Sequence, residues 1–332
     1  MNLDLKNYST FKVGGEAYRI LNLRSEMDIV SAIAYAEKCQ KELIIIGEGS
    51  NSIFSDEHEL FVIGHMQIKG INIKEDTEEY QVIRISAGES WDEIVAWSVG
   101  HNLSGIEALS GIPGTVGAAP IQNIGAYGTE LSDILINVSV YDIENKRFKT
   151  LPASDCMLSY RDSIFKQNPR KYVVTEITIR LSKNSPLIPE YASIKDKFTD
   201  EPTTPAQIRE VILKTRNEKL PDYKMIPNCG SFFKNPIITK EQLILIQKSN
   251  PEIPYFETES DKIKLYAGWL IEHTDYQSLE SVHISFYEKN KLVLINKGNA
   301  SFRELTIVIS KIKEEIKKIF GIDIEVEPNL FS

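Results

Sequence analysis

The stretch LIIIGEGSNSIFSD, residues 43–56, joins an apolar run to a glycine-rich loop. The four apolar residues that open it are typical of a buried strand, and residues 26–40 before them carry apolar side chains at helical spacing. Further along, residues 82–87 alternate in polarity like a strand, and residues 91–100 have the spacing of a helix. Together these helices and strands predict an α+β fold.

The glycines of this first loop, Gly47 and Gly49, follow the predicted strand directly. Glycine has no Cβ, so backbone N–H groups there can approach a ligand, and Ser50, Asn51 and Ser52 add side-chain donors. These donors suit a pyrophosphate, although the G-x-x-x-x-G-K-[ST] pattern of a P-loop is absent. Taken alone, a glycine turn after a strand is more often merely a turn.

A second glycine-rich segment, GIPGTVGAAPIQNIGAYG, covers residues 111–128. Its glycines and prolines favour an irregular backbone whose N–H and C=O groups need partners, and a long loop inside a compact domain is usually functional. An extended planar ligand with a diphosphate would supply those partners, whereas a loop packed on itself is the structural alternative. Because two such loops occur together, we interpret the ligand as a flavin.

The rest of the chain indicates further strands and a separate C-terminal region. Residues 134–142 and 172–181 are expected strands, and residues 205–218 an expected helix that Thr204 opens. Beyond it, a helix near 240–248 and an amphipathic helix at 302–320 are expected, the latter with an apolar stripe of Leu305, Val308, Ile309, Ile312, Ile316 and Ile319. We predict two N-terminal lobes and a separate C-terminal domain that begins near residue 219.

Composition excludes several classes of protein. With 42% hydrophobic and 26% charged residues, the chain is neither disordered nor fibrous. The net charge of −9 argues against a nucleic-acid or anionic membrane partner. With no apolar leader or span, we expect a cytoplasmic protein, and we expect it to be a monomer. Neither the three cysteines nor the five histidines have the spacing of metal ligands, so no metal is expected.

Two polar segments are candidates for chemistry. In LSYRDSIFK, residues 158–166, Tyr160 and Arg161 are expected in a turn, and the planar fork of arginine suits a carboxylate or phosphate. A surface ion pair is the plainer reading of an isolated arginine. In CGSFFKNP, residues 229–236, the hydroxyl of Ser231 could donate a proton, but no G-x-S-x-G motif indicates a serine hydrolase.

Seven motifs, in their order and spacing over nearly the whole chain, carry a family resemblance. They are GEGSN at 47–51, IPGTVG at 112–117, PIQNIGAYG at 120–128, YRDSIFK at 160–166, KLPD at 219–222, GSFFKNP at 230–236 and AGWLI at 267–271. This set resembles the UDP-N-acetylenolpyruvoylglucosamine reductase family, also called UDP-N-acetylmuramate dehydrogenase, in its longer subtype.

The resemblance implies a two-lobed, PCMH-like FAD-binding domain, with lobes at 1–70 and 71–218. A smaller α+β substrate-binding domain at 219–332 follows, and its last residues are expected to return to the flavin. It also implies an oxidoreductase of peptidoglycan synthesis, in which NADPH is the reductant, hydride reaches an enolpyruvyl double bond and UDP-N-acetylmuramate is formed. Its partner is thus a small nucleotide sugar. Ser231 matches the serine that donates the proton, and Arg161 matches the arginine that stabilises charge. Neither glycine loop contains histidine or cysteine, so the FAD is expected to be non-covalent.

The resemblance also implies which residues contact the ligands. The expected cofactor contacts are Gly47, Gly49, Ser50, Asn51, Ser52, Ile112, Pro113, Gly114, Gly117, Gln122, Asn123, Gly125, Tyr127, Gly128, Tyr160 and Arg216. The expected substrate contacts are Tyr191, Lys219, Asn235, Tyr255 and Lys264.

Two segments depart from the family pattern. Family members close with Glu-Pro-Glu, whose second glutamate is catalytic, whereas this chain has Glu327-Pro328-Asn329, so Asn329 stands at that position. Residues 282–287 replace a Gly-Gly-Ala-Ala-Val-His stretch with bulkier side chains. Three hypotheses therefore stand: the family reaction with Asn329 partly replacing glutamate, a divergent flavoprotein with impaired catalysis or another nucleotide sugar, and a structural protein with empty loops. The polar segments around Arg161 and Ser231 speak against the third.

Overall fold

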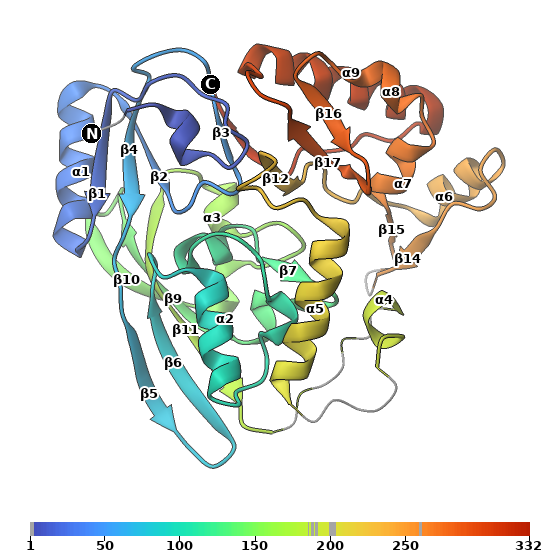
Figure 1. Ribbon diagram of the computed structural model, residues 1–332. Helices are drawn as coiled ribbons and strands as arrows, with labels where there is room; N and C mark the ends of the chain where they lie inside the picture. The colour runs from blue at the N-terminus through green and yellow to red at the C-terminus, as the bar shows by residue number, and fades with distance from the viewer. Residues whose placement is uncertain (1–2, 185, 187–188, 190–191, 199–203, 259–260) are drawn as a thin grey trace. The chain divides into compact units, whose positions relative to one another are not determined.

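The computed structural model describes residues 3–184, 186, 189, 192–198, 204–258 and 261–332. The chain forms two compact units, both discontinuous in sequence (Figure 1). Unit 1 contains Met1–Leu3, Ala17–Glu48 and Glu59–Glu218, and unit 2 contains Asp4–Glu16, Gly49–His58 and Lys219–Ser332. The first glycine loop therefore contributes Gly47 to unit 1 and Gly49 to unit 2. In the part of the chain described, no helix is long and apolar enough to cross a membrane.

Unit 1 begins with a three-stranded parallel sheet in the order β1 (Arg19–Leu23), β4 (Phe61–Met66) and β2 (Glu42–Ile46). Helix α1 (Glu26–Cys39) packs against it (Figure 1). Ser25 caps this helix by accepting a hydrogen bond from the backbone N–H of Asp28. Because the carboxyl ends of parallel strands lie at one edge of a sheet, the first glycine loop leaves unit 1's small sheet at that edge.

The larger sheet of unit 1 is antiparallel, in the order β10 (Arg147–Pro152), β9 (Leu135–Asp142), β11 (Tyr172–Ser182), β6 (Tyr80–Ser86) and β5 (Ile71–Asp76). Its apolar side chains and those of α2 (Trp91–Gly100) form one buried cluster. The expected strands at 82–87, 134–142 and 172–181 are confirmed. Strand β5 was not predicted from the sequence. All six of its residues are exposed, so burial does not alternate along this strand.

The segment after α2 is irregular, as expected, but short helical turns interrupt it. Two 3-10 helices, η2 (Glu107–Leu109) and η3 (Val116–Ile121), precede a small hairpin of β7 (Gly125–Ala126) and β8 (Thr129–Glu130). Helix α5 (Pro205–Lys219) confirms the predicted helix and packs on α4 (Ala192–Lys195). The remaining elements of unit 1 are η4 (Leu131–Asp133), η5 (Ala153–Cys156) and α3 (Ile164–Gln167).

Unit 2 packs small sheets and short helices around its own apolar core. One sheet has the order β12 (Asn228–Ser231), β17 (Asn290–Asn296), β16 (Ile284–Tyr287), and a second has β13 (Ile237–Ile238), β15 (Ile263–Leu265), β14 (Tyr255–Glu257). The C-terminal strand β18 (Asn329–Phe331) runs parallel to β3 (Ser52–Phe54). The helical elements are η1 (Leu5–Tyr8), α6 (Lys240–Gln247), α7 (Ala267–Glu272), α8 (Tyr276–Leu279) and α9 (Phe302–Phe320).

Helix α9 corrects one residue of the predicted apolar stripe. Ile319 is 39% exposed, whereas Phe320 is buried with the other five stripe residues. Phe320 lies four residues after Ile316 and shares its face of the helix. At the other end, the carboxylate of Asp56 accepts a hydrogen bond from the backbone N–H of Phe302 over 2.6 Å, which anchors the start of the helix.

Candidate flavin and proton-transfer sites

The two glycine loops are neighbours within unit 1. The backbone N–H of Gly114 donates to Oε2 of Glu48 over 3.1 Å. A Cβ added at Gly47 would lie 2.1 Å from Oγ1 of Thr115. Residues 47–48 and 114–115 are therefore in direct contact, although more than sixty residues separate them in the chain.

Close packing inside the protein explains why the first loop needs its glycines. Gly49 has φ +70°, and a Cβ there would lie 1.9 Å from the carbonyl oxygen of Tyr8. Gly47 is similarly closed off by Thr115. The interpretation that these glycines leave space for a ligand is thus corrected, because protein atoms fill the space a Cβ would take. Cofactor contact through the backbone of this loop remains a prediction.

We expect Gly49→Ala to destabilise the fold by about 3 kcal/mol or more, since the new Cβ would overlap a backbone oxygen and φ is positive. Gly128→Ala is the control: its φ is +87°, but an added Cβ would meet no atom within 4 Å. That control should lose only about 1 kcal/mol. Urea unfolding measures both, and equal losses would show that packing against Tyr8 is unimportant.

The second loop is held along the start of α2. Trp91 donates its backbone N–H to the carbonyl of Gly114 over 2.9 Å, and Gly117 donates to the carbonyl of Ala87 over 2.8 Å. A Cβ on Gly117 would lie 2.6 Å from Cβ of Ala87. The glycine at 117 is therefore required by its close approach to Ala87, as the glycine at 47 is by the side chain of Thr115.

Asn123 is enclosed by its own loop. It is 0% exposed and has φ +44°. Its side-chain amide donates to Oε2 of Glu130 over 2.6 Å, and its side-chain oxygen accepts the backbone N–H of Ser132 over 2.9 Å. The side chain was predicted to contact the cofactor, but its groups bond the protein, so its contribution is to fix the loop's shape.

The segment around Arg161 wraps the same loop. The guanidinium of Arg161 donates to the carbonyl of Gly125 over 3.1 Å and lies over the ring of Tyr160, 5.3 Å from its centroid. Ser163 donates its hydroxyl to the carbonyl of Ile121 over 2.6 Å. Two motifs that the sequence analysis treated separately are therefore one structure within unit 1, and Arg161 has the left-handed φ of +55° that this turn requires.

Arg216 supplies a positive charge next to the second loop. It is hydrogen-bonded to Tyr127, and a Cβ on Gly111 would lie 3.1 Å from its Nε. Burial lowers the pKa of Arg216, while the neighbouring Tyr127 and Asp92 act in the opposite direction. Open space adjoins the backbone at Gly128, where an added Cβ would meet nothing within 4 Å. A buried guanidinium beside a glycine-rich segment fits the diphosphate of FAD.

Ser231 lies at the end of β12 in unit 2, opposite Val293 of β17. It is half-buried. The preceding Gly230 has φ +72°, and an added Cβ there would meet nothing within 4 Å, so open space lies beside the serine. The hydroxyl is therefore carried by a strand of the sheet.

The chain terminus returns to the segment after Ser231, also within unit 2. Phe233 and Val326 form an antiparallel bridge. The backbone N–H of Glu327 donates to the carbonyl of Phe232 over 3.0 Å. The backbone of Glu327 is consequently bonded to that of Phe232, the residue that follows Ser231.

Glu327 was not among the predicted site residues. It is only 9% exposed, and burial together with the charge of Glu327 raises the pKa of the Cys229 thiol. Asn329 instead belongs to β18, where its backbone N–H donates to the carbonyl of Asn51 over 2.9 Å. A signal was present in the sequence, because Glu325-Val326-Glu327 repeats the Glu-x-Glu spacing of the family's closing motif.

The predicted substrate residues are distributed over several elements. Asn235 accepts the backbone N–H of Ala267 over 2.9 Å and so helps to start α7. Tyr255 and Lys264 lie on the paired strands β14 and β15, and Tyr255 is 43% exposed. Lys219 is exposed at the end of α5. Tyr191 lies outside the described residues.

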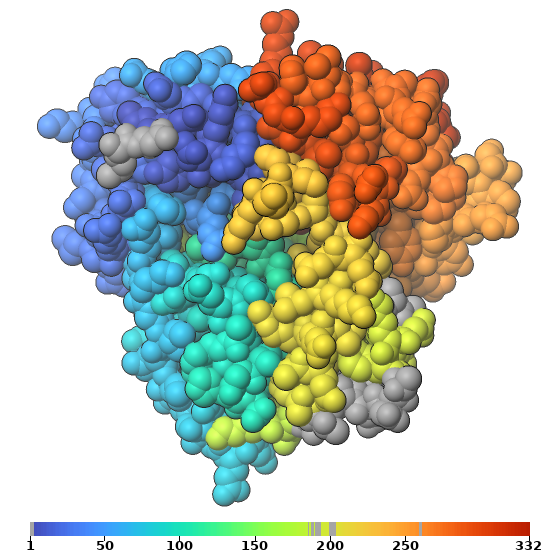
Figure 2. All heavy atoms as spheres, viewed as in Figure 1, coloured from blue at the N-terminus to red at the C-terminus, as the bar shows by residue number. Residues whose placement is uncertain are grey.

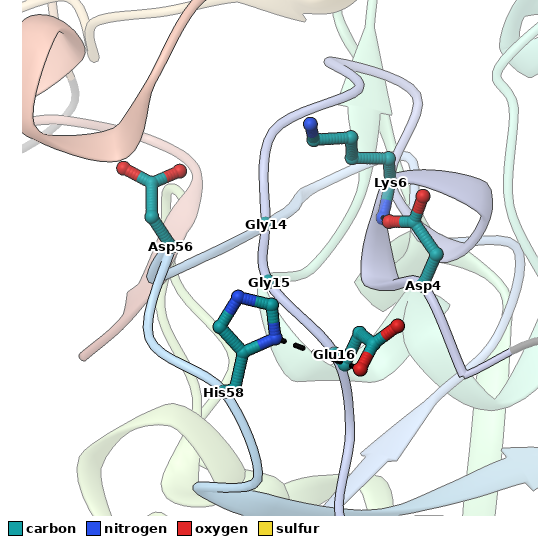
Figure 3. Close-up of a pocket in the computed structure, with 7 residues that line it drawn as sticks. All are labelled: Asp4, Lys6, Gly14, Gly15, Glu16, Asp56 and His58. Atoms are coloured by element: carbon teal, nitrogen blue, oxygen red, sulfur yellow. Dashed lines mark hydrogen bonds and ion pairs between the residues drawn. The ribbon is translucent and has the colours of Figure 1, made fainter.

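One surface cavity of about 350 Å³ in unit 2 contains none of the predicted site residues. Its lining is Asp4, Lys6, Gly14, Gly15, Glu16, Asp56 and His58. In Figure 3 the side chains of His58 and Glu16 face each other, with 3.6 Å between Nδ1 and Oε2. Among the described residues, no group of three or more His, Cys, Asp or Glu is arranged to hold a metal ion.

Comparison with known proteins defines first the class and then the family. Residues 18–149 match the family model of an FAD binding domain, so the chain is a flavin-dependent oxidoreductase of α+β fold. Residues 221–331 match the C-terminal domain of UDP-N-acetylenolpyruvoylglucosamine reductase. The reductase of Pseudomonas aeruginosa is 34% identical over 98% of this chain and 97% of its own length. That of Polynucleobacter asymbioticus is 35% identical over 99% of this chain and 95% of its own.

A solved structure agrees in fold. UDP-N-acetylenolpyruvylglucosamine reductase from Thermus caldophilus superposes with a TM-score of 0.69 at 19% identity, covering 100% of this chain and 98% of that one. The chain belongs to the UDP-N-acetylenolpyruvoylglucosamine reductase family.

Proposed function

We propose that this protein reduces UDP-N-acetylglucosamine enolpyruvate to UDP-N-acetylmuramate in peptidoglycan synthesis, with NADPH as the reductant. Its family membership over nearly the full chain supports the substrate. The observation that carries the chemistry is that Glu327, which is 9% exposed, is bonded through its backbone N–H to the carbonyl of Phe232, the residue that follows Ser231 in unit 2. We further propose that the protein acts as a cytoplasmic monomer, with FAD-binding lobes at 1–70 and 71–218 and a substrate-binding domain at 219–332.

Residues of both glycine loops would hold FAD through backbone N–H groups, and Arg216 would pair with its diphosphate. When bound, FAD supplies the hydride for the double bond of the substrate. The loop geometry supports this assignment. Within unit 1, Gly114 of the second loop is bonded to Glu48 of the first loop, and Gly111 of the second loop packs against Arg216 of α5. The substrate's nucleotide sugar would be bound by Tyr191, Lys219, Asn235, Tyr255 and Lys264.

Reduction of an enolpyruvyl group needs a proton as well as a hydride, and negative charge develops on the substrate carboxylate before that proton arrives. Ser231 is the proposed proton donor. Arg161 is proposed to stabilise the developing charge through its guanidinium. Glu327 is proposed as the acid that acts with Ser231, whereas the earlier expectation assigned this place to Asn329. Burial beside the serine segment favours Glu327, because a carboxyl group can exchange a proton and an amide cannot.

A divergent flavoprotein acting on another nucleotide sugar is the second candidate, motivated by the altered residues 282–287. Within unit 2, however, the bulk of this segment serves the core: Ile284 is 0% and Phe286 is 6% exposed. Only Val282 is widely exposed, at 78%. The altered side chains therefore have a packing explanation, and the first candidate is favoured.

The family reaction can be tested by following flavin absorbance in the purified protein. We expect NADPH to bleach the bound flavin under anaerobic conditions and the enolpyruvyl substrate to restore its colour. UDP-N-acetylglucosamine, which lacks the enolpyruvyl double bond, is the control and should leave the flavin bleached. Bleaching without recovery on the true substrate would support the divergent candidate, and a protein that binds no FAD would contradict both.

A further inference from the structure

We propose that Asp92 and Arg209 form a positioning pair that holds the second glycine loop and Arg216 in the arrangement needed to bind FAD. The inference rests on the proposed FAD site and adds two residues that touch neither ligand. Both residues, and everything they hold, lie in unit 1.

One carboxylate joins three segments of the chain. Oδ1 of Asp92 accepts the backbone N–H of Gly111 over 2.6 Å and Nη1 of Arg209 over 2.6 Å. Oδ2 accepts Nη2 of Arg209 over 2.9 Å. Asp92 lies in the first turn of α2 and Arg209 lies in α5, so a two-pronged ion pair connects these helices with the start of the loop. In Figure 2, the yellow surface of α5 lies beside the teal surface of α2.

The pair is built to be strong. The side chain of Arg209 is 16% exposed, so its guanidinium is largely removed from water, whereas that of Asp92 is 36% exposed and remains in partial contact with solvent. Burial by itself raises the pKa of Asp92, but the hydrogen bonds from Arg209 and Gly111 outweigh it and lower the pKa. The carboxylate also benefits from its place at the N-terminal end of α2. Bidentate contacts of this kind fix orientation as well as distance.

The pair controls where Gly111 lies relative to Arg216. On either side of Gly111, Trp91 of α2 bonds the loop: its indole N–H donates to the carbonyl of Leu109 over 3.2 Å, and its backbone N–H donates to the carbonyl of Gly114. Gly111 itself, at φ +72°, packs closely against Arg216 of α5. Since Arg209 and Arg216 share that helix, the Asp92–Arg209 contact sets the position of the whole helix face against the loop.

The charges lead to the same conclusion. Two guanidinium groups, those of Arg209 and Arg216, lie near one carboxylate, that of Asp92. Arg209 engages both oxygens of this carboxylate, so the charge of Arg216 is not neutralised by a matched ion pair with Asp92 and can serve a phosphate. Removing the carboxylate would leave both cations repelling each other and would release Gly111.

The test is FAD binding to the flavin-free protein, measured by quenching of flavin fluorescence well below the unfolding midpoint of each variant. We expect Asp92→Asn to raise the dissociation constant about tenfold, because a charge-assisted contact is lost. Arg209→Lys keeps the positive charge but loses the two-pronged guanidinium contact, and it should raise the dissociation constant for FAD about threefold. The double variant Asp92→Asn with Arg209→Gln should bind no worse than Asp92→Asn alone, since the two residues act as a unit.

Asp76→Asn is the matched control, because Asp76 forms an ion pair with Lys183 in the same unit, 2.5 Å apart, away from the loop. It should change the dissociation constant less than about twofold. If the Asp92 variant fails to fold, Arg209→Lys decides the matter by the same measurement. Unchanged affinity in a folded variant at either position would overturn the inference alone, whereas absence of FAD binding by the unmodified chain would overturn the proposed function.

Discussion

Glu327→Gln should lower the rate at which substrate reoxidises the reduced flavin by about 10²- to 10⁴-fold, the usual contribution of a general acid or base. Glutamine has nearly the same shape and keeps the backbone bond to Phe232, but it cannot ionise. Because Glu327 is assigned to proton transfer, flavin reduction by NADPH should stay unchanged. Rapid-mixing absorbance measurements separate these two half-reactions.

Asn329 provides the control for this prediction. Asn329 lies in β18, and its backbone pairs with that of Ser52 in β3. Asn329→Ala should therefore retain this strand pairing and reduce the rate of flavin reoxidation by substrate little. Should Asn329→Ala lose the activity while Glu327→Gln keeps it, Asn329 would be the functional residue and the assignment to Glu327 would be wrong. Asn329→Glu adds a third comparison, since a gain in turnover would also favour position 329.

Ser231→Ala is the second change expected to have a large effect, again about 10²- to 10⁴-fold on reoxidation by substrate. Alanine removes the hydroxyl that is proposed to donate the proton, while the strand position opposite Val293 is kept. FAD affinity should be unchanged, as Ser231 belongs to unit 2 and the proposed diphosphate contact, Arg216, belongs to unit 1. Stopped-flow reoxidation and a parallel FAD titration measure both.

Ser285→Ala is a matched serine control, because Ser285 lies in β16 of the same sheet and is 8% exposed. Its loss should leave reoxidation within about twofold of the unmodified rate. A Ser231→Ala variant with an equally small effect would show that the proton comes from another group. Cys229, two residues before Ser231, is a poor substitute donor, because burial and the charge of Glu327 hold its thiol pKa far above the usual range.

The spacing of apolar residues along the chain was sufficient to predict most of the helices and strands. The helices at 26–40, 91–100 and 302–320 were predictable because each buries one face and therefore repeats its apolar residues at helical spacing. Strand β5 was not predicted, because the apolar-polar alternation of Ile71-Asn72-Ile73-Lys74 is too short to decide, and all six residues of this edge strand are exposed. Strand β1 also escaped prediction, although it pairs in register with β4.

Residues 43–56 and 111–128 were sufficient, by composition, to predict two irregular loops, and the spacing of seven motifs was sufficient to indicate the family. Only the tertiary structure decided what individual residues do there. Position 49 requires glycine because of its close contact with Tyr8, and Asp92 forms an ion pair with Arg209, 117 residues away in the chain. Glu327 is paired with Phe232 by a backbone bond that no local pattern encodes. The physical reason is that glycine, helical and strand signals arise from neighbouring residues, whereas burial, contact and charge pairing depend on segments that only folding brings together.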